Sequence, residues 1–238
     1  MTLFSILVVG LLLGMKHATE ADHLAAVATL VTRQGSLAQT LQQGVAWGVG
    51  HTLTLMVFAG AVFVLGEVIS PRLEHALETA VGIMLIVLGA DVLRRLIRDR
   101  IHFHVHRHGP AVEHVHAHSH RGEGLHERSQ HRHAHAKRWP LRALAVGVMH
   151  GLAGSAALVV LSLKSVPSLS LGLVYVAVFG VGSIIGMAIL SIVIALPLRI
   201  SARFSAGYLA GLHRSMTALV GVFSCTLGLA MVLRLGYF

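Results

Sequence analysis

Long apolar stretches alternate with short polar or charged breaks along the whole chain. The apolar stretches cover approximately residues 2–32, 40–66, 75–97, 140–164, 169–199 and 206–236. The hydrocarbon core of a bilayer is spanned by about 20 apolar residues in a helix, so each stretch is long enough to cross it. The pattern predicts an all-α integral membrane protein with six transmembrane helices. The first stretch is too long for one straight crossing, so we expect it to be tilted, or broken near Gly14.

The two halves of the chain resemble each other. Similar segments recur in the same order, at 14–17 and 147–150, 47–51 and 179–183, and 80–89 and 219–228. Because each half contains three helices, an odd number, the second half must enter the membrane from the opposite side. We therefore predict two inverted three-helix repeats, residues 1–98 and 139–238, joined by a histidine-rich cytoplasmic loop at 99–138.

Charged residues are scarce and unevenly placed. Only 12% of the 238 residues are charged, against about 25% in an ordinary soluble domain. Eleven of the nineteen lysines and arginines lie between Arg94 and Arg142 with few aromatic residues among them, so the net charge of +9 does not indicate nucleic-acid binding. Because the connections after odd-numbered helices are the more basic, we expect them to be cytoplasmic. Both termini would then lie outside a multi-pass cell membrane protein of the bacterial inner-membrane type.

Ionisable residues interrupt the first apolar stretch. His17, Glu20, Asp22 and His23 lie within seven residues of one another. Such side chains are costly at membrane depth and usually mark an ion or substrate path. Imidazoles beside carboxylates are also suitable ligands for a divalent transition metal. The segment therefore predicts a metal site, the alternative being that these groups pair only with one another and with a neighbouring lysine.

A regular helix cannot direct this whole set at one ion. At 100° per residue, His17 and Asp22 lie about 140° apart, and His17 and His23 about 120° apart in the other direction. A break in the helix, or a partner from another helix, is therefore needed. His51 is a candidate partner, because Gly48 and Gly50 allow close helix approach. The alternative for His51 is a hydrogen bond to a backbone carbonyl.

His150 occupies the position of His17 in the second half. Its segment lacks an Asp-His pair, so the two halves are chemically unequal. His150 is a candidate accessory ligand or gating group, and packing is the alternative role. Glu20 is a second candidate accessory ligand, because its carboxylate lies inside the motif.

The central loop is rich in histidine. It contains twelve of the eighteen histidines, namely His102, His104, His106, His108, His114, His116, His118, His120, His126, His131, His133 and His135. Alternate spacing lets an extended chain offer several imidazoles to one ion, and low hydrophobicity predicts disorder without metal. We expect low-affinity metal capture there. The alternative is a solvated loop that acts only as a pH-dependent reservoir of charge.

These motifs resemble those of a known family. His17, Asp22 and His23 are similar to the motif of the nickel/cobalt transporter family of secondary permeases, and Gly50-His51-Thr52 is similar to its Gly-His-Ser element. Chain length and segment 150–155 resemble the short six-helix urease-associated nickel permeases most. The resemblance implies that His17, Asp22, His23 and His51 bind the transported ion. The main family has eight helices, and its further motifs are not recognisable in the second half.

We therefore expect a secondary permease for Ni²⁺, with Co²⁺ as a second candidate. Import is favoured because six-helix nickel/cobalt efflux proteins, which also carry a histidine-rich loop, are less similar at Asp22; efflux for metal resistance is the alternative. An inside-negative potential contributes about 4.6 kcal/mol per 100 mV to the uptake of a divalent cation. Neither a His-Glu-x-x-His nor a P-loop pattern occurs, so we expect no enzyme.

The expected partners follow from this function. They are a divalent transition-metal ion and the lipid bilayer, with a cytoplasmic metal chaperone as a candidate, no nucleic acid and no prosthetic group. A protein that delivers metal with the loop alone is a further alternative. It predicts that deletion of residues 102–135 abolishes function, whereas a permease would lose function on substitution of His17 or Asp22.

Overall fold

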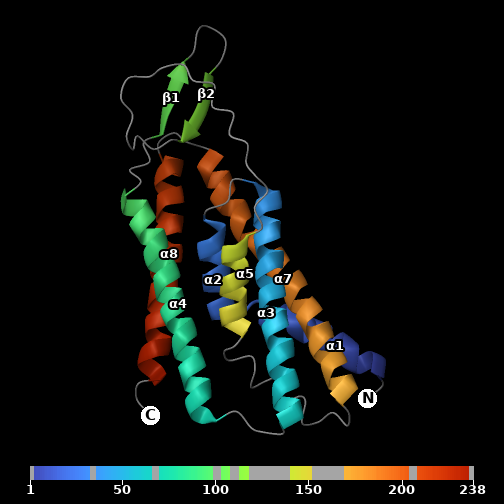
Figure 1. Cartoon of the computed structure of the whole chain (residues 1–238). Coiled ribbons are helices and arrows are strands. Elements are labelled where there is room, and N and C mark those ends of the chain that lie inside the picture. Colours follow the sequence, from blue (N-terminus) through green and yellow to red (C-terminus); the bar gives the residue numbers. More distant parts are fainter. Residues whose placement is uncertain are drawn as a thin grey trace.

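Helices make up almost all of the regular structure. The computed structural model describes residues 3–32, 36–65, 70–98, 103–107, 113–117, 140–151, 169–203 and 208–235. Within these residues the helices are α1 (Leu3–His17), α2 (Ala21–Val31), α3 (Leu37–Leu65), α4 (Pro71–Arg98), α5 (Leu141–Gly151), α7 (Leu169–Arg203) and α8 (Tyr208–Leu235), as Figure 1 shows. The strands β1 (Phe103–Arg107) and β2 (Glu113–Ala117) form an antiparallel pair.

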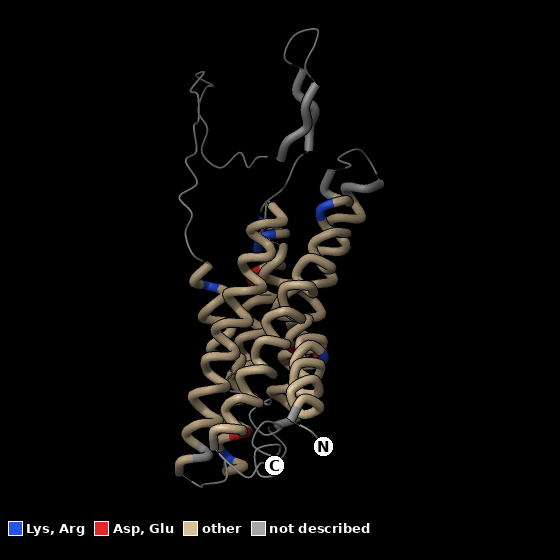
Figure 2. The backbone as a smooth tube through the Cα atoms, turned by 90° about the vertical axis from the view of Figure 1, so that its right-hand side faces the viewer, with Lys and Arg blue, Asp and Glu red and all other residues tan. Residues whose placement is uncertain are grey.

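The bundle has the dimensions and surface of a membrane protein. Among the described residues, α3, α4, α7 and α8 are each long and apolar enough to cross a bilayer, and α1 with α2 makes a fifth span if the bent pair is one crossing. Large apolar side chains such as Val57, Val87 and Leu219 are well exposed on the outside, where lipid would cover them. Lys and Arg lie mostly toward the ends of the bundle (Figure 2). A multi-pass helical membrane protein is thus confirmed.

The fourth predicted span is described only in part. It was expected over residues 140–164, and the structure describes α5, while residues 152–168 lie outside the described residues. The six-span prediction therefore stays a prediction for this helix. The other expected spans agree with α3, α4, α7 and α8 to within a few residues, because a long apolar run bounded by charge or proline is a strong signal.

The first apolar stretch is broken, which is one of the two predicted alternatives, but the break comes later in the chain than Gly14. Gly14 lies inside α1, where its lack of a side chain serves packing: an added Cβ would overlap the carbonyl oxygen of Phe179 on α7. The break comes after His17, and α1 and α2 meet at an angle of 59°. The hydroxyl of Thr19 donates to the carbonyl oxygen of Lys16 at 2.6 Å, which satisfies an acceptor at the end of α1.

Glycines set the distances between the helices. A Cβ at Gly147 on α5 would overlap the carbonyl oxygen of Trp47 on α3. On the α4–α8 contact, a Cβ at Gly82 would lie 2.9 Å from the carbonyl oxygen of Gly228, and one at Gly89 would lie 2.6 Å from that of Gly221. Such contacts let backbones approach closely, as in other membrane helix pairs.

Helix α2 lies at the centre of the bundle. It contacts α3, α4, α7 and α8, and most of its side chains from His23 onward are buried. Its small residues Ala25 and Ala26 are fully buried in the main core, together with Trp47 of α3, Leu85 of α4 and Met187 of α7. The two histidines on either side of the break, His17 and His23, are therefore held in the interior beside a well-packed helix.

Of the predicted histidine-rich loop, the structure describes only the two strands. β1 and β2 lie inside the segment for which the sequence predicts disorder, and His104 pairs with His116 and His106 with His114 in the backbone register. The other eight loop histidines, at 102, 108, 118, 120, 126, 131, 133 and 135, lie outside the described residues. Disorder and metal capture in the loop stay predictions.

Candidate metal site

The break between α1 and α2 brings two motif histidines together. His17 is the last residue of α1, and His23 lies in the first turn of α2. Glu20 has an extended backbone at the N-cap of α2, so the chain changes direction between the two histidines. As a result their ring centroids lie 4.3 Å apart. The break thus achieves what a straight helix cannot.

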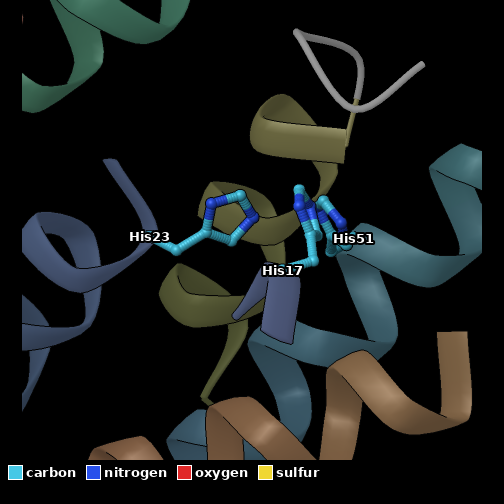
Figure 3. A group of neighbouring side chains, drawn as sticks. All are labelled: His17, His23 and His51. Carbon is cyan, nitrogen blue, oxygen red and sulfur yellow. The ribbon is translucent and has the colours of Figure 1, made fainter. Parts of the chain in front are cut away.

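A third imidazole completes the cluster from α3. The ring of His51 lies 5.3 Å from that of His17 and 5.2 Å from that of His23. Each of the three residues offers a ring nitrogen within 4.8 Å of the other two, and all three side chains are buried. Figure 3 shows the three rings facing one another. Bonds of about 2 Å between metal and imidazole nitrogen would draw these atoms around one ion with small rotations of the side chains.

Several ring nitrogens of this cluster have no hydrogen-bond partner among the described residues. They are Nε2 of His17, Nε2 of His23 and both nitrogens of His51. A buried polar atom without a partner costs about 1–3 kcal/mol. Three neighbouring histidines bear this cost together, and a shared ligand that accepts lone pairs would relieve it for all three.

Two of these rings contact a carboxylate through Nδ1, the nitrogen other than the unpartnered Nε2. Glu20 Oε1 lies 3.0 Å from Nδ1 of His17, and Asp22 Oδ1 lies 3.0 Å from Nδ1 of His23. Because a carboxylate accepts, each Nδ1 donates its proton, and Nε2 keeps the lone pair that a metal needs. Carboxylate–histidine–metal arrangements of this kind fix the tautomer and the orientation of the ring.

Asp22 makes a second contact across the two halves of the chain. Its Oδ2 lies 2.9 Å from Nε2 of His150 on α5, so one carboxylate joins His23 and His150. The ring of His150 lies 4.1 Å from that of His23. Asp22 stands in the first turn of α2, where the positive end of the helix dipole stabilises a negative charge.

Two aromatic residues that the sequence analysis did not identify as part of the site lie against it. Trp47 packs against His23 and His150 with ring centroids 5.4 and 5.6 Å away, and its fully buried indole N–H has no partner among the described residues. Phe179 packs against His17 at 5.4 Å. The repeat contains a signal for this pair, because Trp47 and Phe179 occupy equivalent positions in segments 47–51 and 179–183.

The structure brings the main predicted site residues together, but the histidines and the carboxylates make different contacts. His17, His23 and His51 face one another directly, whereas Asp22 and Glu20 contact imidazole N–H groups. His150, expected as an accessory residue, lies beside His23 and is buried.

The chain is similar to the urease accessory protein UreH of Bacillus sp. (strain TB-90), with 34% identity over 234 residues that cover 98% of this chain and 93% of that protein. No protein-family model matches the sequence. No solved structure matches it either. The likeness to UreH extends over both halves and is not confined to the histidine motif.

Proposed function

The chain belongs to the family of the urease accessory protein UreH, as its resemblance to the short urease-associated nickel permeases predicts, and we propose that it is a secondary permease for nickel ions. The observation that carries this proposal is the set of unpartnered imidazole nitrogens of His17, His23 and His51, buried together within a membrane bundle. Nitrogen-rich ligation is suited to Ni²⁺, and Co²⁺ is the second candidate. The family name describes an accessory protein, which agrees with a chain that does no catalysis.

The helix end beside the cluster favours a cation. His17 lies in the last turn of α1. The negative end of this helix dipole therefore approaches the site, where it attracts a positive ion. Helices that end inside the membrane around a bound ion are a common feature of secondary transporters. This supports transport as the role of the cluster.

Reciprocal glycine contacts support the proposed inverted repeat. Segment 14–17 is equivalent to 147–150, and 47–51 is equivalent to 179–183. Gly14 of the first half is in contact with Phe179 of the second, and the equivalent Gly147 is in contact with the equivalent Trp47. Exchanging the two halves turns one contact into the other. Rocking of one half against the other would then expose the ion alternately to the two sides.

We propose import as the direction of transport. The intact Asp22-His23 pair resembles the importers, and the membrane potential drives a divalent cation inward without ATP. An accessory role toward a urease, carried over from UreH, would require metal to enter the cell. The more basic connections would face the cytoplasm, and the histidine-rich loop there would receive the imported ion.

Uptake of radioactive nickel into cells tests the proposal. Cells that express the protein should accumulate more nickel than control cells. The Asp22→Asn variant should take up nickel at least about tenfold more slowly, since loss of a carboxylate that orients a ligand histidine lowers metal affinity or activity by about 10–100-fold. Asp91→Asn is the matched control, because Asp91 pairs with Arg142 near the bundle end and outside the cluster. Wild-type uptake in Asp22→Asn would contradict the proposed site. Lower nickel in expressing cells would establish efflux instead.

A further inference from the structure

Asp22, His23 and His150 form a second group of neighbouring metal-ligand atoms, and this group shares His23 with the first. We propose that it is a second ion position, adjacent to the cluster of His17, His23 and His51, and that the transported ion passes between the two positions across the imidazole of His23. The inference rests on the proposed function, because it describes the path of the same ion.

His23 has one nitrogen for each position. Its Nε2 is unpartnered among the described residues and belongs to the first cluster, while its Nδ1 lies 3.0 Å from Asp22. Its ring lies 4.3 Å from that of His17 and 4.1 Å from that of His150. A single side chain thus touches both groups, and no other residue belongs to both.

The proton balance allows the ion to move without changing the charge of either imidazole. With the ion on Nε2 of His23, the ring proton is on Nδ1 and is held by Asp22. With the ion on Nδ1, the ring is in its other tautomer with the proton on Nε2, and the ion has taken the place of the proton beside Asp22. His150 behaves in the same way, because its Nδ1 has no partner among the described residues and takes the proton when Nε2 binds the ion. Each ring remains neutral with one proton in both states.

The two positions are reached by helices that come from opposite ends of the bundle. α1, which ends at His17, packs at Gly10 against Tyr175 near the start of α7. α5, which carries His150, begins beside the last turns of α4, where Arg142 donates to Asp91 at 3.1 Å. Figure 1 shows the same arrangement, with the start of α1 and the start of α5 at opposite ends. An ion that moves from His17 to His150 therefore passes from one half of the chain to the other.

The positions exclude each other. They share His23, and two divalent ions a few ångströms apart would repel each other strongly. The second position has one feature that the first lacks, which is the carboxylate of Asp22 contacting both of its imidazoles. One ion per chain should therefore distribute between a site of three imidazoles and a site of one carboxylate and two imidazoles.

Cobalt binding to the purified full-length protein tests this inference. Co²⁺ is the probe, because its visible absorption reports the ligand set. In every sample the twelve loop histidines are replaced by asparagine, so that the loop adds no signal. His51→Ala removes a ligand of the first position only, and His150→Ala removes a ligand of the second position only. His23→Ala removes the ligand that the two positions share. His213→Ala, which removes an imidazole on α8 that contacts Ser201, is the control for losing a histidine elsewhere.

The expected result is specific to two positions. The unsubstituted site binds one Co²⁺, with a spectrum that is a weighted sum of the spectra of His51→Ala and His150→Ala. These two variants each retain one Co²⁺ within about tenfold of the original affinity but differ from each other in spectrum. His23→Ala loses about 100-fold in affinity, and His213→Ala leaves spectrum and affinity unchanged. Elution as a monodisperse species in detergent verifies that each variant is folded.

Two other outcomes separate the inference from the function on which it rests. If His51→Ala abolishes binding while His150→Ala keeps the original spectrum, a single position exists and Asp22 only orients His23. The second position is then refuted, and the permease proposal stands. If His23→Ala binds Co²⁺ like the unsubstituted site, the buried cluster is not the ion site, and both proposals fail.

Discussion

The two halves of the chain share their packing but differ in their chemistry. Gly14 and Gly147 occupy equivalent positions, and each allows its helix to contact a backbone carbonyl of the opposite half. At the next equivalent pair the halves differ, because His51 faces the imidazole cluster whereas the hydroxyl of Ser183 donates to the carbonyl oxygen of Gly14 at 3.2 Å. The residues that build the bundle are thus distinct from those proposed to bind the ion.

The aromatic neighbours of the two equivalent histidines extend this comparison. His17 packs against Phe179, and His150 packs against Trp47, so each histidine is covered by the aromatic residue of the opposite half. Only the first half adds the carboxylate and the second imidazole, in Asp22 and His23. The proposed repeat would thus hold an asymmetric ligand set, with most of its donor atoms supplied by the first half.

The strongest test of the shared frame is to fill its glycine contacts. Gly14→Leu and Gly147→Leu should both prevent folding, because even a Cβ at either position overlaps a backbone oxygen that no side-chain rotation can move. Overpacking typically costs about 1–3 kcal/mol and costs more where backbone is the obstacle. The measurement is the yield of monodisperse protein in detergent.

Gly211→Leu is the matched control for this test. A Cβ at Gly211 meets no atom of the described residues within 4 Å, so this variant should be recovered like wild type. Equal loss in Gly14→Leu and Gly147→Leu would support equivalent roles in the two halves. Normal recovery of either one would contradict the close contact at that position.

The next test addresses the chemical difference between the halves. His51→Ala should lower nickel uptake by about 100-fold, because it removes a ligand of the first position. Ser183→Ala should lower uptake by no more than about fivefold, because it removes one hydrogen bond worth about 1 kcal/mol. Initial uptake rates at equal amounts of protein in the membrane measure both. Similar losses in the two variants would show that the asymmetry has no part in transport.

The sequence predicts the helices better than it predicts the site. Long apolar runs determine where helices can cross a bilayer, and α3, α4, α7 and α8 agree with them closely. The pairing of His17, His23 and His51 follows from the motif and from the geometry of a helix, which requires a break or a partner. The structure supplies both, in the bend after His17 and in α3.

The remaining features depend on tertiary contacts that no local pattern specifies. The break lies at residues 18–20 and not at Gly14, because Gly14 is used for packing against Phe179. The sequence suggests Asp22 as a direct ligand, but which atoms its carboxylate contacts depends on the approach of α5. That approach places Nε2 of His150 2.9 Å from the carboxylate. A residue 128 positions away thus decides how Asp22 acts.

The smallest change in uptake is expected when the loop histidines are replaced and the buried histidines are kept. Replacing the twelve loop histidines by asparagine in the full chain should leave the maximal rate of nickel uptake unchanged. It should raise the nickel concentration that gives half-maximal uptake by less than about tenfold, because weak capture of metal concentrates the ion near the path but does not form it. Uptake measured across a range of nickel concentrations gives both quantities. Loss of uptake at saturating nickel would instead assign an essential step to the loop, and the buried cluster would no longer suffice as the transport site.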